Sequence, residues 1–275
     1  MTIATYTNRY EIKYLTDARA VPEIEAGLLD FLVPDKNGSG RHGYYNHSIY
    51  FDSPDFRFYR EKREGELVRL KPRLRFYRPA PDAKPKAAFL ELKGRYDRIV
   101  EKRRGPIGLD LAERLLSDSL FEPDRKAMES SAVREFYYLA RRYCLAPCVS
   151  VLYHRAAYFG AFYPNVRVTF DRVIRCSRYT GPDGADDALI YALPPNQLIL
   201  ELKYNDKIPR LLLKRFNSLG LQQVTFSKFG VAMERTHDEI LPRRFLLARP
   251  VGAPRPRSVG SLMTAWVGRL KASTP

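Results

Sequence analysis

Arg69-Leu-Lys-Pro-Arg-Leu-Arg-Phe-Tyr77 is the stretch around which the rest of the sequence can be organised. At the two-residue period of a β-strand, its cations share one face and its apolar residues share the other. The cationic face carries Arg69, Lys71, Arg73 and Arg75, and the apolar face carries Leu70, Leu74 and Phe76. A row of like charges on one face is either solvated or built to hold a polyanion, and this stretch alone leaves both open.

Pro72 divides the row into two pairs of cations. Proline has no N–H to donate and is found at sheet edges or bulges, so a bulge or bend is expected there. The expected bulge would separate Arg73 and Arg75 from Arg69 and Lys71.

The composition indicates a folded protein with an anionic partner. Among the 275 residues, 45% are hydrophobic and 12% aromatic, which excludes an intrinsically disordered chain. Lys and Arg number 47 against 31 Asp and Glu, a net charge of +16. Such a balance predicts binding to nucleic acid, anionic lipid or phosphate-rich molecules.

Cysteine usage and the N-terminal sequence predict a cytoplasmic protein. Cys144, Cys148 and Cys176 form neither a disulfide framework nor a zinc-binding spacing. The first residues show no leader pattern, and no apolar run is long enough to span a membrane. The four histidines have no ligand spacing and are interpreted as ordinary surface or core residues.

Hydrophobic periodicity predicts an α+β domain over residues 1–240. Strands are expected at 9–14, 45–52, 69–77, 89–93, 98–104, 149–159, 165–171 and 198–205. Helices are expected at 21–32, 109–116, 130–143 and 209–219.

Residues 241–275 form a separate tail by composition. Arg, Pro and Gly dominate from Pro242 onward, which is typical of a linker. Residues 259–272 then place apolar side chains on one face of a basic helix. This helix could dock on its own domain, contact a partner, or lie on an anionic membrane.

The predicted strands repeat the pattern of residues 69–77, with an apolar face and a cationic face that carries occasional carboxylates. The cations are Arg9, Lys13, Arg69, Lys71, Arg73, Arg75, Lys93, Lys102, Arg155, Arg167, Lys203 and Lys228. The carboxylates are Glu11, Glu91 and Glu201. If helices cover the apolar faces and the cations share an interior, self-repulsion disfavours an empty interior and favours a chain of phosphates. The glutamates could hold a divalent metal among those phosphates.

No other catalytic machinery stands out in the sequence. It contains no Gly-rich phosphate loop followed by Gly-Lys-Ser/Thr, and no Gly-x-Ser-x-Gly nucleophile elbow. Phosphoryl transfer needs little covalent help from the protein, because positioning and charge neutralisation supply most of the catalysis.

Seven motifs in order give the chain a family resemblance. They are Glu-Ile-Lys-Tyr14, Tyr50-Phe-Asp-Ser53, Arg-Leu-Arg-Phe-Tyr77, Leu-Glu-Leu-Lys93, Lys102-Arg-Arg, Leu-Glu-Leu-Lys-Tyr204 and Phe-Ser-Lys-Phe-Gly230. Over about residues 8–235 the chain resembles the VTC domain, the polyphosphate polymerase domain of the vacuolar transporter chaperone. That domain belongs to the CYTH, or triphosphate tunnel metalloenzyme, superfamily.

The resemblance implies an eight-stranded antiparallel β-tunnel with helices packed outside and a basic interior. It implies transfer of the terminal phosphate of ATP to a growing polyphosphate, with Mn²⁺ or Mg²⁺ as cofactor. The implied catalytic residues are Lys13, Arg73, Arg75, Lys93, Arg155, Arg167 and Lys228. Further substrate contacts are expected from Lys71, Lys102, Tyr153, Lys203 and Ser227, and metal binding from Glu201, Glu91 and Glu11.

The sequence departs from the superfamily pattern in two respects. Tunnel hydrolases typically open with Glu-x-Glu-x-Lys, but here Arg9 takes the place of the first glutamate, which favours the polymerase branch. The chain also shows neither an SPX sensor domain nor transmembrane helices, so product translocation is not expected. A metal-dependent triphosphatase, a non-catalytic polyphosphate binder and a nucleic-acid module are the alternatives. The last is disfavoured because the cations are spread over many strands.

Overall fold

The computed structural model describes residues 9–28, 30–35, 42–96, 99–181, 189–205 and 207–237, with the side chains of residues 9, 99 and 100 excluded. The predicted linker and tail helix at 241–275 lie outside the described residues, as does the side chain of Arg9.

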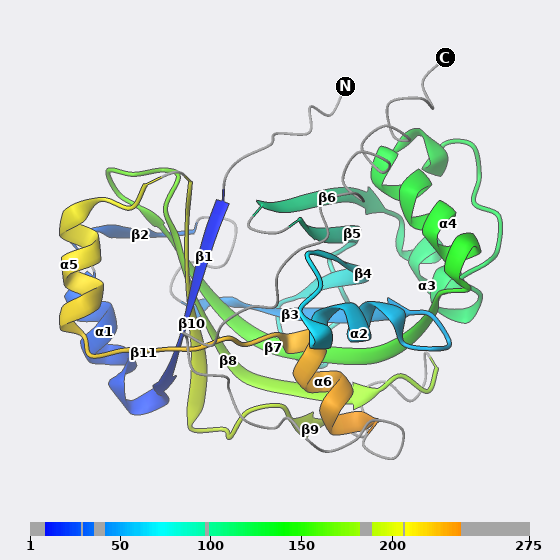
Figure 1. The fold of residues 1–275 in the computed structure, drawn as a ribbon. Coiled ribbons are helices and arrows are strands. Elements are labelled where there is room, and N and C mark those ends of the chain that lie inside the picture. The colour runs from blue at the N-terminus through cyan, green and yellow to red at the C-terminus, as the bar shows by residue number, and fades with distance from the viewer. Residues whose placement is uncertain are drawn as a thin grey trace.

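One antiparallel sheet runs through the whole described chain (Figure 1). Its eight long strands are β1 (Arg9–Asp17), β3 (Tyr44–Asp52), β4 (Val68–Arg78), β5 (Ala87–Tyr96), β6 (Ile99–Ile107), β7 (Ala146–Gly160), β8 (Arg167–Arg178) and β10 (Gln197–Asn205). Three short strands are added: β2 (Leu32–Pro34), β9 (Ile190–Tyr191) and β11 (Gln222–Gln223). The order is β11-β1-β10-β8-β7-β3-β4-β5-β6, with β2 on β7 and β9 on β8.

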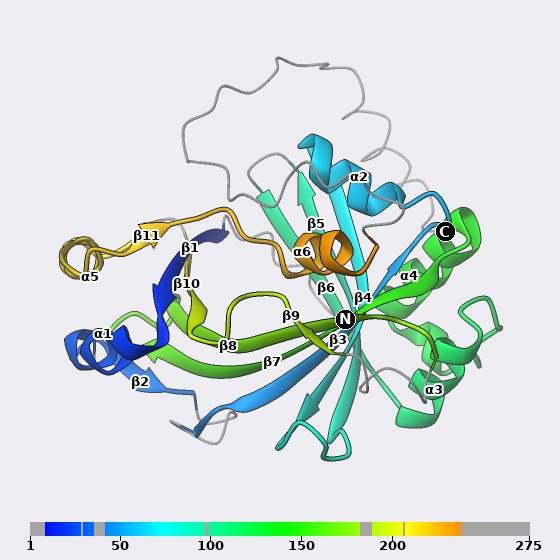
Figure 2. The same cartoon turned by 90° about the horizontal axis from the view of Figure 1, so that it is seen from below.

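The α+β class and the antiparallel sheet are confirmed, but the expected closed eight-stranded tunnel needs correction. The sheet has eleven strands, and among the described residues β1 and β6 do not pair to close it. Seen from below, the strands curve into a trough whose two walls are β1–β10 and β4–β6 (Figure 2).

Helices cover the outer, apolar face of this trough on both sides (Figure 2). On one side α1 (Val21–Leu28) and α5 (Arg210–Ser218) pack against a core that includes Tyr14, Val168 and Leu200. On the other, α3 (Leu109–Ser117) and α4 (Ser131–Tyr143) pack over Leu74, Leu90 and Leu92. The short 3₁₀ helices η1 (Ala18–Ala20) and η4 (Ala127–Glu129) lead into α1 and α4. Because the outer faces are buried, the alternating polar residues face the inside of the trough.

Helix α6 (Lys228–Thr236) lies inside the trough (Figure 2). Its Phe229 and Met233 join a third apolar cluster with Val151, Ile174 and Ile199 of the sheet. The ring of Phe229 also stacks on Tyr50, with 5.0 Å between centroids. One part of the concave face is therefore filled by α6, and the polar remainder is left for the charged side chains.

Strand β4 shows why Pro72 does not produce the expected bulge. The register with β5 is uninterrupted, with Lys71 opposite Lys93, Pro72 opposite Leu92 and Arg73 opposite Glu91. On the other side, pairing with β3 stops at Tyr50 and Arg73. Pro72 thus occupies the first position beyond the β3 ladder, where its missing N–H costs no hydrogen bond.

One further expectation about local structure was wrong, and one helix was not predicted. The periodic stretch 21–32 was predicted to be one helix, but α1 ends at Leu28 and Leu32 pairs with Gly160 of β7. Strand pairing there overrides the helical spacing. Residues 57–64 form a helix, α2 (Arg57–Glu64), that the sequence did not predict. Its many charged residues give no strong apolar stripe, and only Phe58 and Tyr59 are buried.

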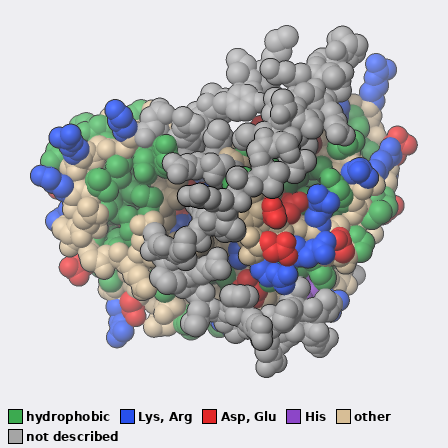
Figure 3. All heavy atoms as spheres, in the orientation of Figure 1, with side chains coloured by type: hydrophobic (Ala, Val, Ile, Leu, Met, Phe, Trp, Pro, Cys, Tyr) green, Lys and Arg blue, Asp and Glu red, His purple; other side chains and the backbone are tan. Residues whose placement is uncertain are grey.

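The outer surface seen in Figure 3 is mixed in charge. Acidic and basic side chains are interspersed over α2, and hydrophobic side chains gather on the side of α1 and α5 (Figure 3). None of the described helices is long and apolar enough to cross a membrane.

Asp52 fixes the start of α2 and gives a first prediction. Its Oδ1 accepts from the Phe58 amide and its Oδ2 from the Tyr59 amide, both at 2.9 Å. Replacing a capping aspartate with alanine leaves amides of the first turn unsatisfied. We expect Asp52→Ala to lower the free energy of unfolding by about 1–2 kcal/mol, measured by urea denaturation. A loss no larger than that of the exposed substitution Asp82→Ala would contradict the capping role.

Candidate functional site: a basic concave face

The candidate site is the polar concave face of the sheet. Strand registers place the predicted cations of neighbouring strands side by side: Lys71 opposite Lys93, and Lys93 opposite Lys102. On the other wall Lys13 is opposite Glu201, and Lys203 is opposite both Glu11 and Arg167. The sequence-predicted residues are thus brought together on one surface.

Glu91 is the centre of the first charge cluster. This carboxylate is fully buried and contacts four cations. Arg73 Nη2 lies 2.6 Å away, Lys102 Nζ 2.8 Å, Arg104 Nε 3.4 Å and Arg75 Nε 3.6 Å. Burial alone would raise the pKa of Glu91, but Arg73 and Arg75 lower it far below the ordinary value. The carboxylate is therefore ionised and fixes the direction of both arginines.

Hydrogen bonds hold the outer ends of the same two arginines. Arg73 donates to the Tyr50 hydroxyl at 3.0 Å, and Arg75 donates to Ser48 Oγ at 3.2 Å and to the Tyr153 hydroxyl at 3.4 Å. Burial would raise the pKa of Tyr50, yet Arg73 and Arg75 outweigh it and lower that pKa. These hydroxyl groups restrict the movement of both cations. Such preorganisation favours anion binding.

Asp171 and Glu201 form the second cluster. Arg155 makes a bidentate pair with Asp171, at 2.6 and 2.7 Å, and reaches Glu201 at 3.4 Å. Lys228, at the start of α6, contacts both carboxylates, and Lys203 contacts Glu201. Burial would raise the pKa of Glu201, but the surrounding lysines and Arg155 hold it well below the ordinary value.

Side chains link the two walls of the trough where the backbone does not. Glu11 of β1 contacts Lys13 at 3.0 Å and Lys93 of β5 at 3.1 Å. Lys71 of β4 donates to Ser227 Oγ at 3.0 Å, and Ser227 caps α6. Together with the two clusters these contacts place charged side chains on both walls of the concave face, and we call this set of side chains the ring.

The ring carries more cations than carboxylates. Ten cations belong to it: Lys13, Lys71, Arg73, Arg75, Lys93, Lys102, Arg104, Arg155, Lys203 and Lys228. Four carboxylates face them: Glu11, Glu91, Asp171 and Glu201. Lys71 shows the consequence, because the described residues place no carboxylate within ion-pair distance of its Nζ. Burial, followed by repulsion from Lys93 and Lys13, lowers the pKa of Lys71 far below its usual range.

Some of the predicted residues occupy different surroundings from those expected. Arg167 lies on the concave face of β8, but its guanidinium pairs with Asp35 at 2.9 Å, apart from both clusters. Asp171 and Arg104 belong to the clusters but were not selected from the sequence. Both alternate with selected neighbours, Arg167 and Lys102, so the two-residue strand period was the available signal.

Two of the three predicted metal ligands fit a divalent cation. Glu11 Oε1 and Glu201 Oε1 lie 3.0 and 3.7 Å from the same Lys13 Nζ, so two carboxylates converge at one point. Mg²⁺ is commonly held by one or two carboxylates together with substrate phosphates and water. Glu91 fits less well, because none of the cations that contact it is shared with a second carboxylate of the described residues. Within the described part of the chain, no three or more His, Cys, Asp or Glu residues are grouped so that they could hold a metal alone.

Two lysines of the ring titrate near neutral pH. Burial, only partly offset by Glu91, lowers the pKa of Lys102 to about 7, and burial, only partly offset by Glu201, lowers that of Lys203 to about 8. A bound polyanion favours the charged form of both lysines and so raises their pKa values, which means that binding takes up protons.

We therefore expect tripolyphosphate to bind more tightly at pH 6.5 than at pH 8.5. Calorimetry in buffers of different ionisation enthalpy should show proton uptake. The double variant Lys102→Arg, Lys203→Arg carries permanent charges and is the matched control. It retains the pH response of tripolyphosphate itself, so the difference from the wild type reports the two lysines alone. The same proton uptake in this double variant would contradict the assignment.

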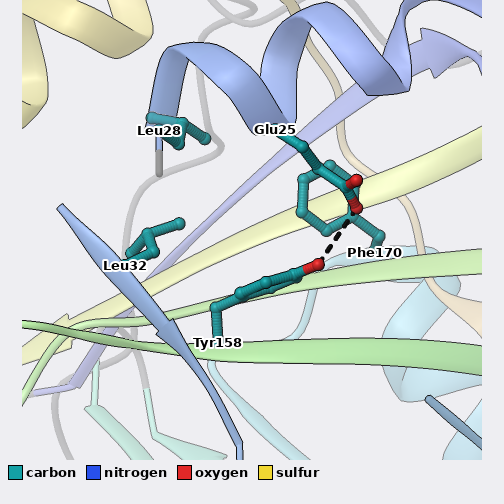
Figure 4. A pocket seen from close by; sticks show the side chains of 5 residues that line it. All are labelled: Glu25, Leu28, Leu32, Tyr158 and Phe170. Atoms are coloured by element: carbon teal, nitrogen blue, oxygen red, sulfur yellow. Dashed lines mark hydrogen bonds between the residues drawn. The ribbon is translucent and has the colours of Figure 1, made fainter. Parts of the chain in front are cut away.

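A small pocket on the outer face is not part of this site. It lies between α1, β2 and the β7–β8 pair, and is lined by Glu25, Leu28, Leu32, Tyr158 and Phe170 (Figure 4). The Tyr158 hydroxyl donates to Glu25 Oε1 at 3.1 Å. The pocket has a volume of about 10 Å³ and admits no more than a water molecule, so it belongs to the packing of α1 on the sheet.

Comparison with known families shows which family this chain belongs to. The model of the family described as "VTC domain" matches residues 8–237. The chain belongs to the VTC domain family. The resemblance seen in the sequence motifs is thereby confirmed.

Two solved structures show a distant likeness to this VTC domain. A putative adenylate cyclase from Vibrio parahaemolyticus is 11% identical with a TM-score of 0.44, covering 81% of this chain and 96% of its own. A putative adenylate cyclase from Bacillus halodurans is 15% identical with a TM-score of 0.44, covering 80% of this chain and 95% of its own. No curated protein matches the chain.

Proposed function

We propose that this VTC domain transfers the terminal phosphate of ATP to a growing polyphosphate on its concave face. The observation that carries the proposal is the uncompensated charge of the ring, above all at Lys71. A half-buried lysine that is repelled by neighbouring cations is costly in the free protein. A chain of phosphates supplies the missing negative charge at Lys71 and around the rest of the ring.

The two clusters have different parts in the proposed reaction. Arg73 and Arg75, held by Glu91 and by hydroxyl groups, present fixed donors to phosphate oxygens. Arg155 of β7 and Lys228 of α6, held by Asp171 and Glu201, present a second set. Placing the terminal phosphate of ATP between them, in line with the end of the acceptor chain, supplies the positioning and charge neutralisation on which phosphoryl transfer depends.

A divalent metal is part of the proposal. When bound with the nucleotide it would offset phosphate charge, and Glu11 and Glu201 are the residues that would hold it. Phosphate binding by Lys13 would release these two carboxylates from their shared ammonium group.

The test is incubation of the purified protein with ATP and Mn²⁺. Products are separated on a gel that resolves polyphosphate, and free phosphate is measured in parallel. Polymer that lengthens with time is the expected result. Free phosphate without polymer would replace the proposal by a triphosphatase. Tight tripolyphosphate binding with neither product would replace it by a non-catalytic binder.

A further inference from the structure

Asn46 is a buried amide that the ion-pair ring does not use. It lies on the concave face of β3, in alternation with Ser48 and Tyr50, which bond to Arg75 and Arg73. Its side chain is fully buried, and neither Oδ1 nor Nδ2 has a hydrogen-bond partner among the described residues. Leaving both groups of an amide unsatisfied costs stability, so such a residue calls for an explanation.

Aromatic rings lie beside this amide. Tyr77 of β4 is directly opposite Asn46, and the Tyr77 ring contacts Tyr44 and Phe89, each with 5.6 Å between centroids. Arg104 stacks 3.5 Å from the centroid of Phe89 and donates to the Tyr77 hydroxyl at 3.2 Å. The rings of Tyr44, Tyr77 and Phe89 are half-buried, so part of their surface remains accessible.

The aromatic group continues directly from the phosphate-binding cations. Along the concave face of β4 the order is Lys71, which contacts the cap of α6, then Arg73, Arg75 and Tyr77. Arg73 and Tyr77 are four residues apart, about 13 Å at the rise of a β-strand. A nucleotide whose outer phosphates contact Arg73 and Arg75 could therefore place its base among these rings.

We propose that Asn46, Tyr44, Tyr77 and Phe89 form a nucleobase subsite that prefers adenine. The amide of Asn46 presents one donor and one acceptor, which match N7 and the N6 amino group of adenine. Guanine shows two acceptors, O6 and N7, on the same edge and matches the amide less well. The aromatic rings supply stacking surface. Because Asn46 is fully buried, the base reaches it when the half-buried ring of Tyr77 or Tyr44 turns aside.

This inference rests on the proposed function, because it needs a nucleotide whose phosphates occupy the ring. Calorimetric Kd values for ATP, GTP and tripolyphosphate separate the nucleobase subsite from the proposed phosphate-binding function. We expect ATP to bind the wild-type protein about tenfold more tightly than GTP. This comparison does not depend on the folding of any variant.

Point variants show which residues determine the preference for adenine. Asn46→Ala is expected to make the Kd values of ATP and GTP equal while leaving that of tripolyphosphate unchanged. Tyr77→Ala should weaken both nucleotides about tenfold, and Tyr77→Phe, which keeps the ring, should bind like the wild type. Tyr138→Ala removes an exposed tyrosine from α4 and is the matched control.

The outcomes distinguish the subsite from the anion site. Equal binding of ATP and GTP by the wild-type protein would overturn the adenine preference. Unchanged nucleotide binding in Tyr77→Ala, with tripolyphosphate still bound, would overturn the subsite alone. Binding of neither tripolyphosphate nor ATP would overturn both the subsite and the proposed function.

Discussion

Glu91→Gln is expected to lower the free energy of unfolding by about 3–5 kcal/mol in the absence of ligand. The wild-type carboxylate is fully buried and contacts Arg73, Arg75, Lys102 and Arg104. The amide of glutamine keeps the volume but removes the charge, so four cations repel one another without compensation. Loss of one partner of a buried ion pair is among the costliest single changes.

The substitution Glu91→Gln should also change the pH dependence of stability. The folded-state pKa of Glu91 lies below its unfolded value, so its contribution is present above about pH 4.5 and is lost as the pH falls toward the folded-state pKa. Urea denaturation between pH 3 and pH 7 should therefore show a weaker acid dependence in Glu91→Gln than in the wild-type protein.

Polyanion binding should largely rescue the same variant. Because a bound phosphate chain supplies the negative charge that the variant has lost, we expect tripolyphosphate to raise the Tm of Glu91→Gln by more than it raises that of the wild type. Glu64→Gln removes a half-exposed carboxylate paired with Arg63 and is the control, with an expected loss of about 0–1 kcal/mol. Equal losses in the two variants, or no added rescue by tripolyphosphate, would contradict the role given to Glu91.

Strand periodicity alone was sufficient to place much of this site. Leu70, Leu74 and Phe76 pack in the core, and this fixes Lys71, Arg73 and Arg75 on the concave side. The same alternation places Glu201 and Lys203 on the concave side, because Leu200 and Leu202 are buried against the outer helices. Wherever one face of a strand is buried, the alternation also determines which residues lie on its other face.

Contacts between distant segments could not be predicted from strand periodicity. Asp171 pairs with Arg155 only because β7 and β8 are adjacent, and its place in the cluster depends on Lys228 of α6. The position of α6 inside the trough follows from the packing of Phe229 and Met233 on the sheet, which no local pattern reveals. Pro72 was misread for the same reason, because a bulge was inferred without knowing where the β3 ladder ends.

Lys71→Met is expected to separate stability from function. In the wild-type protein burial and the neighbouring lysines lower the pKa of Lys71, so near neutral pH the unfolded chain binds a proton more readily than the folded one. Stability therefore rises with pH between the folded and unfolded pKa values of this lysine. At pH 7 the presence of Lys71 lowers the free energy of unfolding. Methionine has a similar length and no charge, so the variant should be at least as stable as the wild type.

Anion binding should change in the opposite direction. A bound phosphate would favour the protonated form of Lys71 and gain a charge-assisted hydrogen bond, worth about 1.5–3 kcal/mol. We expect Lys71→Met to weaken tripolyphosphate binding by roughly tenfold to a hundredfold, measured by calorimetry. Lys84→Met, which removes an exposed lysine from the β4–β5 loop, controls for the change in net charge.

These opposite effects discriminate between two explanations of the basic face. If Lys71 served only to hold Ser227 and the start of α6, its loss would lower stability and leave binding by the other cations intact. If the face is built for a chain of phosphates, the protein tolerates an unfavourable lysine because the ligand makes it favourable. A more stable protein that binds tripolyphosphate poorly is the result that only the second explanation predicts.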